Sequence, residues 1–71
     1  MKKPPKARLS GREIEALTWS ARGLTSIEIA HTLGMTKRNV DFYLDNARSK
    51  LGAVTRIHAV AMAIQGKLIR P

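Results

Sequence analysis

The side chains best suited to chemistry lie near the middle of this 71-residue chain. Asp41 and Asp45 stand four residues apart, so a helix would place both carboxylates on one face. An acid–base pair needs a pocket that separates the two pKa values, and no convergent groups accompany these acids. His31 and His58 are 27 positions apart, and the chain has no cysteine. We therefore expect no enzyme, no metal site and no cofactor.

The residues around the two acids suit contact with a nucleic acid. Lys37, Arg38 and Asn39 precede them; asparagine matches the edge of adenine, and arginine matches guanine or a phosphate. On a helix, Phe42 would lie about 200° around the axis from Val40 and would point outward. An outward aromatic ring can contact a thymine methyl group, although a scattered surface residue or one covered by a neighbour is the alternative.

The charge balance agrees with a polyanionic partner, since thirteen Lys and Arg residues oppose five Asp and Glu, for a net charge of +8. A merely soluble surface is the alternative. Four of the basic residues lie within residues 1–8, beside Pro4 and Pro5. Because proline disfavours a helix there, residues 1–8 are predicted to be a flexible basic arm or linker, and residues 9–71 the domain.

The two acids allow two hypotheses. Each carboxylate could accept a hydrogen bond from a cytosine amine in the major groove. Alternatively, Asp41 could pair with Lys37 and Asp45 with Arg48 along the same helix, which would contribute about 0.2–0.5 kcal/mol for each pair. The sequence leaves both hypotheses open.

Four helical segments must position these residues, and we see no alternation typical of a strand, so the fold class is all-α. Each segment opens on a hydroxyl-bearing N-cap and stops at or near a glycine. The N-caps are Ser10, Thr25, Thr36 and Thr55, and the stops are Gly23, Gly34, Gly52 and Gly66. Ser10 with Glu13, and Thr25 with Glu28, have the spacing of a capping box.

Apolar residues recur at helical spacing in the segments. In the third segment the inner stripe is Val40, Leu44, Ala47 and Leu51; in the first it is Ile14, Leu17, Thr18 and Ala21. The fourth segment is apolar on more than one side, with Ile57, Ala61, Ile64 and Leu68 on one face and Val60, Met62 and Ala63 beside it. A helix that is apolar on more than one side needs two surfaces to cover it, of which one could be the core and the other a partner. The residues expected at a partner interface are Val60, Met62 and Ala63.

A short helix, a turn containing glycine and a longer helix together form a helix-turn-helix, here from about Thr25 to Leu51. The second helix of this motif lies in the major groove of double-stranded DNA. Thr25 and Thr36 cap helix N-termini that can bind phosphate, and Arg48 and Lys50 are expected at the DNA backbone. The complete set of expected DNA contacts is Thr25, Thr36, Lys37, Arg38, Asn39, Asp41, Phe42, Asp45, Arg48 and Lys50.

From Leu9 to Ile69 the chain resembles LuxR-type (GerE-like) DNA-binding domains. The resemblance rests on Leu9-Ser10-Gly11-Arg12-Glu13, Leu17, Trp19, Ala21, Gly23, Thr25, Glu28-Ile29-Ala30, Val40, Asn46, Lys50-Leu51-Gly52, Thr55-Arg56, Ala59-Val60, Ala63 and Leu68-Ile69. Trp19 and Gly66-Lys67-Leu68-Ile69 look most like the quorum-sensing branch. The resemblance implies a four-helix domain whose third helix reads DNA and whose fourth helix forms a homodimer on a palindromic site. It also implies base contacts at Asp41 and Asp45, where other members often have basic or amide residues, so the preferred site should differ. Tyr43, where histidine is common, is a second departure.

The function expected is therefore sequence-specific DNA binding and transcription regulation, as the output domain of a quorum-sensing regulator in the bacterial cytoplasm. Such regulators usually carry an N-terminal sensing domain, so the chain is expected to be a C-terminal fragment or a stand-alone regulator. The expected partners are double-stranded DNA, a second copy of the chain and RNA polymerase, with no membrane and no small-molecule ligand. The alternatives are a helix-turn-helix that binds only protein, and a basic domain for RNA or acidic membranes.

Overall fold

Four α-helices account for most of residues 8–71, the part of the chain that the computed structural model describes. The helices are α1 (Gly11–Ala21), α2 (Ser26–Leu33), α3 (Lys37–Leu51) and α4 (Arg56–Gln65). No strand occurs within this described range, and the all-α, four-helix prediction is confirmed. The arm predicted at residues 1–8 lies, apart from Arg8, outside the described residues.

Hydroxyl side chains begin all four helices, as the sequence predicts. Each N-cap oxygen accepts a hydrogen bond from the backbone N–H three residues later, at 3.0–3.2 Å, in Ser10, Thr25, Thr36 and Thr55. In α1 and α2 the carboxylate of Glu13 or Glu28 also accepts the N-cap N–H at 2.8 Å, which completes both capping boxes. Local hydrogen bonds therefore explain where each helix starts.

The turn between α2 and α3 is short because Gly34 adopts a left-handed conformation, with φ of 69°. The next residue, Met35, donates its N–H to the carbonyl of Ala30 at 2.9 Å, which closes the end of α2. Thr36 then caps α3 at once. A residue with a side chain would be strained at Gly34, so this backbone fixes the helix-turn-helix connection.

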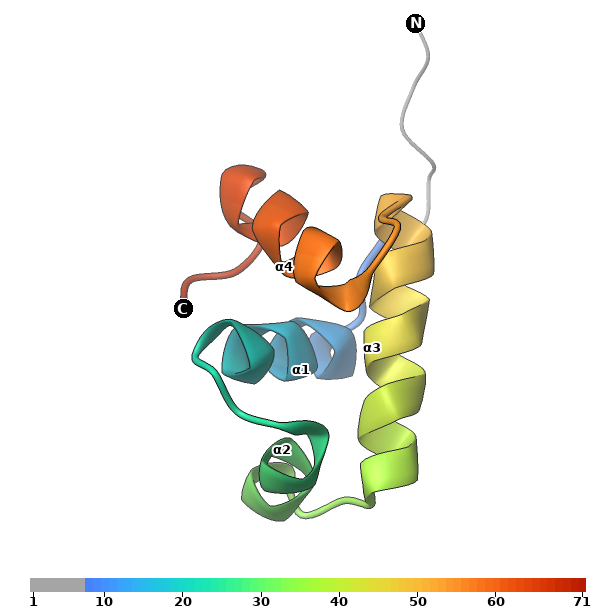
Figure 1. Cartoon of the computed structure of the whole chain (residues 1–71), viewed down its shortest axis with the longest axis vertical. Helices are drawn as coiled ribbons and strands as arrows, with labels where there is room; N and C mark the ends of the chain where they lie inside the picture. The colour runs from blue at the N-terminus through green and yellow to red at the C-terminus, as the bar shows by residue number, and fades with distance from the viewer. Residues whose placement is uncertain (1–7) are drawn as a thin grey trace, which may run out of the picture.

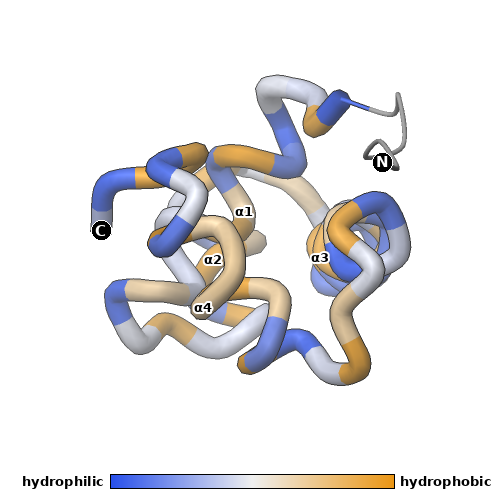
Figure 2. The backbone as a smooth tube through the Cα atoms, turned by 90° about the horizontal axis from the view of Figure 1, so that it is seen from above, coloured by the Kyte–Doolittle hydropathy of each residue, from blue (hydrophilic) through white to orange (hydrophobic). Residues whose placement is uncertain are grey.

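Helix α3 is the element against which the other three helices pack. In Figure 1 it stands upright, and α4, α1 and α2 lie beside it from top to bottom. Seen from above in Figure 2, α3 stands to one side of the other three helices, so one of its long sides has no described helix against it. The predicted inner stripe of α3 is correct: Val40, Leu44 and Ala47 are buried, and Leu51 is partly buried against the same core.

Helix α4 turns a different side inward from the one expected. Ala59 and Ala63 are fully buried, whereas Ile57 is 83% exposed and Ile64 is 42% exposed. The expected interface residue Ala63 therefore lies inside the domain core, and Val60 and Met62 are partly buried against that core. Small alanine side chains allow α4 to approach its neighbours closely, which favours this side over the bulkier stripe.

Candidate nucleic-acid interface

The outward side of α3 gathers most of the predicted contact residues. Lys37, Arg38, Asn39, Phe42 and Asp45 are exposed, and all project from the first nine residues of the helix. Phe42 is 58% exposed, and its ring lies edge-to-face against the ring of Tyr43, with 5.7 Å between the two ring centroids. The prediction that Phe42 points to solvent is confirmed, and its contact with DNA stays a prediction.

Two threonines flank this surface. Thr25 and Thr36 are exposed and lie at the N-termini of α2 and α3, the two helices of the helix-turn-helix. Their side-chain oxygens accept backbone N–H groups, but each hydroxyl hydrogen can still donate to a phosphate oxygen. The geometry is therefore compatible with their expected role at the DNA backbone.

The two basic residues near the end of α3 make their hydrogen bonds within the domain. Arg48 donates to the carbonyl of Ala53 at 3.1 Å. Lys50 donates to the carboxylate of Glu13 at 2.9 Å and to the carbonyl of Arg8 at 3.0 Å. Neither side chain joins the exposed group at the start of α3, so the structure does not gather all the predicted contacts on one surface.

The acids of α3 form an ion-pair network. Asp41 binds Lys37 at 2.7 Å, and this local pair confirms one of the two pairs considered from the sequence. The other pair is wrong, because Asp45 binds Arg56 of α4 at 3.1 Å rather than Arg48. Arg56 also binds Asp41, at 3.0 Å. Sequence spacing predicts pairs only within a helix, so Arg56, eleven residues beyond Asp45, was not among the expected residues.

The network keeps its groups charged. Hydrogen bonds from Lys37, Ser26 and Arg56 lower the pKa of Asp41 to about 2 against the desolvation that opposes them. Partial burial would lower the pKa of Arg56, but the carboxylates of Asp41 and Asp45 outweigh it and raise the pKa. The outward side of α3 and its border with α4 therefore carry both signs of charge at neutral pH.

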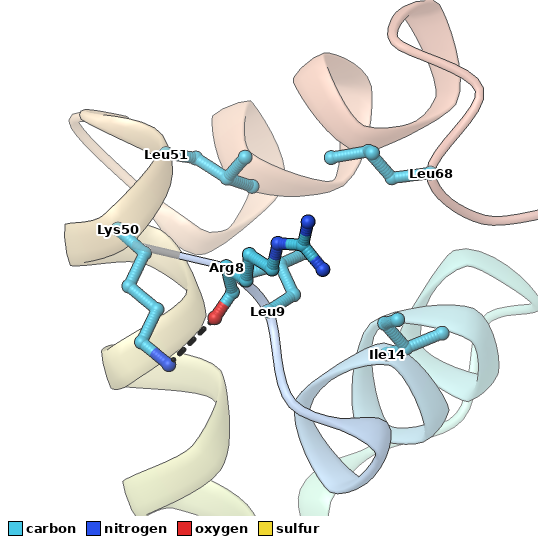
Figure 3. Close-up of a pocket in the computed structure, with 6 residues that line it drawn as sticks. All are labelled: Arg8, Leu9, Ile14, Lys50, Leu51 and Leu68. Atoms are coloured by element: carbon cyan, nitrogen blue, oxygen red, sulfur yellow. Dashed lines mark hydrogen bonds between the residues drawn. The ribbon is translucent and has the colours of Figure 1, made fainter. Parts of the chain in front are cut away.

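A second ion pair lies near the C-terminal end of α3. Burial favours protonated Glu13, but the hydrogen bonds from Lys50 and from the Ser10 backbone outweigh it, and the pKa of Glu13 is lowered. Beside this pair is a hollow of about 320 Å³ lined by Arg8, Leu9, Ile14, Lys50, Leu51 and Leu68. Figure 3 shows Lys50 reaching the Arg8 carbonyl at its edge. Glu13 was expected only as a cap, and only the fold reveals its link to Lys50.

The geometry suits recognition by surface contacts. Across residues 8–71, no three His, Asp or Glu side chains come together to form a metal site. No helix in that range is long and apolar enough to cross a membrane. The main chemical feature is the exposed side of α3, where hydrogen-bond donors, acceptors and an aromatic ring lie together.

Comparison with known proteins agrees with this geometry. The family described as "Bacterial regulatory proteins, luxR family" matches residues 7–63. The chain is 45% identical over 67 residues to the transcriptional activator protein BjaR1 of Bradyrhizobium diazoefficiens, and 42% identical over 67 residues to the transcriptional activator protein VanR of Vibrio anguillarum. It is 48% identical over 63 residues to RpaR of Rhodopseudomonas palustris, an HTH-type quorum sensing-dependent transcriptional regulator.

These matches cover most of this chain but little of each relative. They span 94% of the chain for BjaR1 and VanR and 89% for RpaR, but only 28%, 28% and 26% of the three relatives. The chain thus corresponds to about a quarter of each of these proteins.

Proposed function

The chain belongs to the LuxR family of bacterial regulatory proteins, whose helix-turn-helix domains bind DNA in transcription regulation, and we propose that it recognises a specific double-stranded sequence through α3. One observation carries the proposal: the outer side of α3 is free of other described helices and presents Arg38, Asn39 and Phe42 to solvent. The major groove is about 12 Å wide and admits one helix with its side chains. Within it, these three side chains suit guanine, adenine and a thymine methyl group.

The remaining contacts divide by position. Thr25, Thr36 and Lys37 border the exposed face at helix N-termini, so we assign them to phosphates. Arg48 and Lys50 would have to leave Ala53 and Glu13 to reach DNA. We therefore propose weaker phosphate contacts for these two residues. Asp45 has one side-chain partner and is more than half exposed, so it remains a candidate acceptor for a cytosine amine.

Selection of bound duplexes from a random library tests this function directly. A DNA-binding domain should enrich one sequence, and its affinity should fall linearly as salt rises on logarithmic scales, with a slope of about −0.9 for each phosphate contact. A domain that uses its helix-turn-helix only for protein contact would enrich no sequence. That result would overturn the proposal.

We also propose a homodimer on a palindromic site, formed through the side of α4 that the fold leaves exposed. That side carries Ile57, Ala61 and Ile64, in place of the residues expected from the sequence. Exposed apolar side chains that adjoin one another favour a protein partner. Sedimentation with and without a palindromic duplex tests this: the complex should contain two chains per duplex, and Ile57→Glu should reduce it to one.

The relatives support a wider role. RpaR is named as quorum sensing-dependent, and BjaR1 and VanR as transcriptional activators. We propose that this chain is the output domain of such a regulator in the bacterial cytoplasm and that RNA polymerase is a further partner. Transcription in vitro with purified polymerase, from a promoter carrying the selected site, tests the polymerase contact. A reporter strain followed through growth tests the dependence on cell density.

A further inference from the structure

One carboxylate joins three helices. The Oδ1 atom of Asp41 in α3 accepts hydrogen bonds from Ser26 Oγ at 2.7 Å and from Arg56 Nη1 at 3.0 Å, and its Oδ2 accepts from Lys37 at 2.7 Å. Ser26 is the first residue of α2, and Arg56 is the first residue of α4. Within residues 8–71 the backbones of α2 and α4 do not approach each other. Asp41 therefore links α2 and α4, two helices whose backbones are not in direct contact.

Arg56 holds α3 at two successive turns. Its Nη1 and Nη2 groups donate to the side chain and the backbone carbonyl of Asp41, at 3.0 and 3.3 Å, and its Nε donates to Asp45 at 3.1 Å. A planar guanidinium can satisfy several acceptors in one fixed orientation, which a single ammonium group cannot do. The contact therefore restricts both the rotation and the tilt of α3 relative to α4.

The two acids of α3 differ in the number of hydrogen bonds that their carboxylates already accept. Asp41 has three side-chain partners and a side chain only 26% exposed, whereas Asp45 pairs with Arg56 alone and is 55% exposed. A carboxylate offers about four lone-pair sites, so most of the capacity of Asp41 is already used. A cytosine amine would find one acceptor site left on Asp41, on the Oδ2 atom that already binds Lys37.

We propose that Asp41 and Arg56 are a pair of positioning residues that set the orientation of α3 against α2 and α4 and so contribute to sequence selectivity without contacting a base. This inference rests on the proposed function, because selectivity presupposes that α3 reads DNA. The base contacts themselves then fall to neighbours on the outer face such as Arg38, Asn39 and Phe42.

The test compares Asp41→Ala, Arg56→Gln and the double variant with wild type, by measuring affinity for the selected duplex varied one base pair at a time. Glu15→Ala and Arg12→Gln are matched controls, since they make the same charge changes in an exposed ion pair on α1. Each single test variant should lower the ratio of specific to non-specific affinity about fivefold, at the same base positions. The double variant should be no worse than the singles, Arg56→Lys should retain part of the ratio, and the controls should match wild type.

A different pattern would overturn the proposal. If Asp41→Ala relaxed discrimination at one base pair while Arg56→Gln kept the wild-type profile, Asp41 would be a base-reading residue. Additive losses in the double variant would likewise show that the two residues act separately.

NMR of the free domain provides a readout without DNA and also confirms that each variant is folded. Asp41→Ala should shift backbone amides at the starts of both α2 and α4 and speed hydrogen exchange of the Arg56 Nη1 group, which loses its acceptor. Shifts confined to α3 would overturn the link between helices even if the wild type binds its site normally. A wild-type domain that enriches no sequence would instead overturn the proposed function, and the NMR result would still test the link.

Discussion

Ion pairs connect helix α3 to a neighbouring helix at two places within the described residues, and the two places have different surroundings. Near its C-terminus, Lys50 binds Glu13 of α1, and the carboxylate side chain is only 4% exposed. Nearer its N-terminus, Asp41 and Asp45 bind Arg56 of α4, with side chains between 26% and 55% exposed. We refer to these as the buried tie and the exposed tie.

The difference in burial assigns the two ties different roles. A buried charge that loses its partner is destabilising because water cannot replace the lost contact. Exposed ion pairs contribute only about 0–1 kcal/mol, since water competes for both partners. Breaking the buried tie should therefore mainly lower the free energy of unfolding. Breaking the exposed tie, or changing the face around it, should mainly weaken DNA recognition.

The strongest way to break the comparison is Glu13→Ala. This change removes the capping carboxylate of α1 and the partner of Lys50 together, so we expect the free energy of unfolding to fall by about 2–3 kcal/mol in denaturant titrations. The control is Glu28→Ala, which removes the same capping contact from the exposed box of α2, at about 0.5–1 kcal/mol. Equal losses of unfolding free energy in the two variants would show that the ion pair between Lys50 and Glu13 adds no stability.

Phe42→Ala tests whether the exposed face of α3 acts in DNA recognition rather than in stability. The ring is mostly exposed, so the free energy of unfolding should change by less than about 0.5 kcal/mol. Affinity for the selected duplex should fall about tenfold, through loss of an apolar base contact. Phe42→Leu should keep much of that affinity in the same titration. A large loss of stability without loss of affinity would place Phe42 in the fold rather than in recognition.

Acid titration tests how much the exposed tie contributes to stability. Because the pKa of Asp41 falls from 3.8 to about 2 on folding, the unfolded chain binds the proton more readily. The resulting stability is present above about pH 4 and is lost as pH falls towards 2, and screening limits it to about 1 kcal/mol. The difference in unfolding free energy between wild type and Asp41→Ala should shrink over this interval. A constant difference would contradict the assignment.

The smallest effect is expected for an ion pair that belongs to neither tie. Arg12 and Glu15 pair at 3.1 Å with side chains about half exposed, so Glu15→Gln should change the free energy of unfolding by less than about 0.5 kcal/mol. Thermal unfolding at two salt concentrations measures it. A larger effect would mean that exposure alone does not separate the ties.

Features set by neighbouring residues could be predicted from the sequence. The four N-caps, the turn at Gly34 and the inner stripe from Val40 to Ala47 depend on spacing along one helix, and all were correct. Contacts between helices could not be predicted in the same way. The links Lys50–Glu13 and Arg56–Asp45 depend on how the helices pack, and no local spacing encodes them.

The face of α4 shows the same limit for apolar residues. Its bulky stripe and its alanines are both periodic, so hydrophobicity alone does not decide which side turns inward. Close approach to the other helices decides it, and that favours Ala59 and Ala63. For the candidate site, exposure of Phe42 was predictable from its angle on the helix, but the partners of Asp45 were not.

The packing of α3 has a thermodynamic consequence for association. The helix is complete from Lys37 to Leu51, capped at both ends and held by three neighbours before any partner arrives. Binding through it therefore incurs little loss of backbone conformational entropy, unlike a segment that folds on contact. The heat-capacity change of binding should therefore reflect only the surface buried between two folded partners, with no contribution from helix formation.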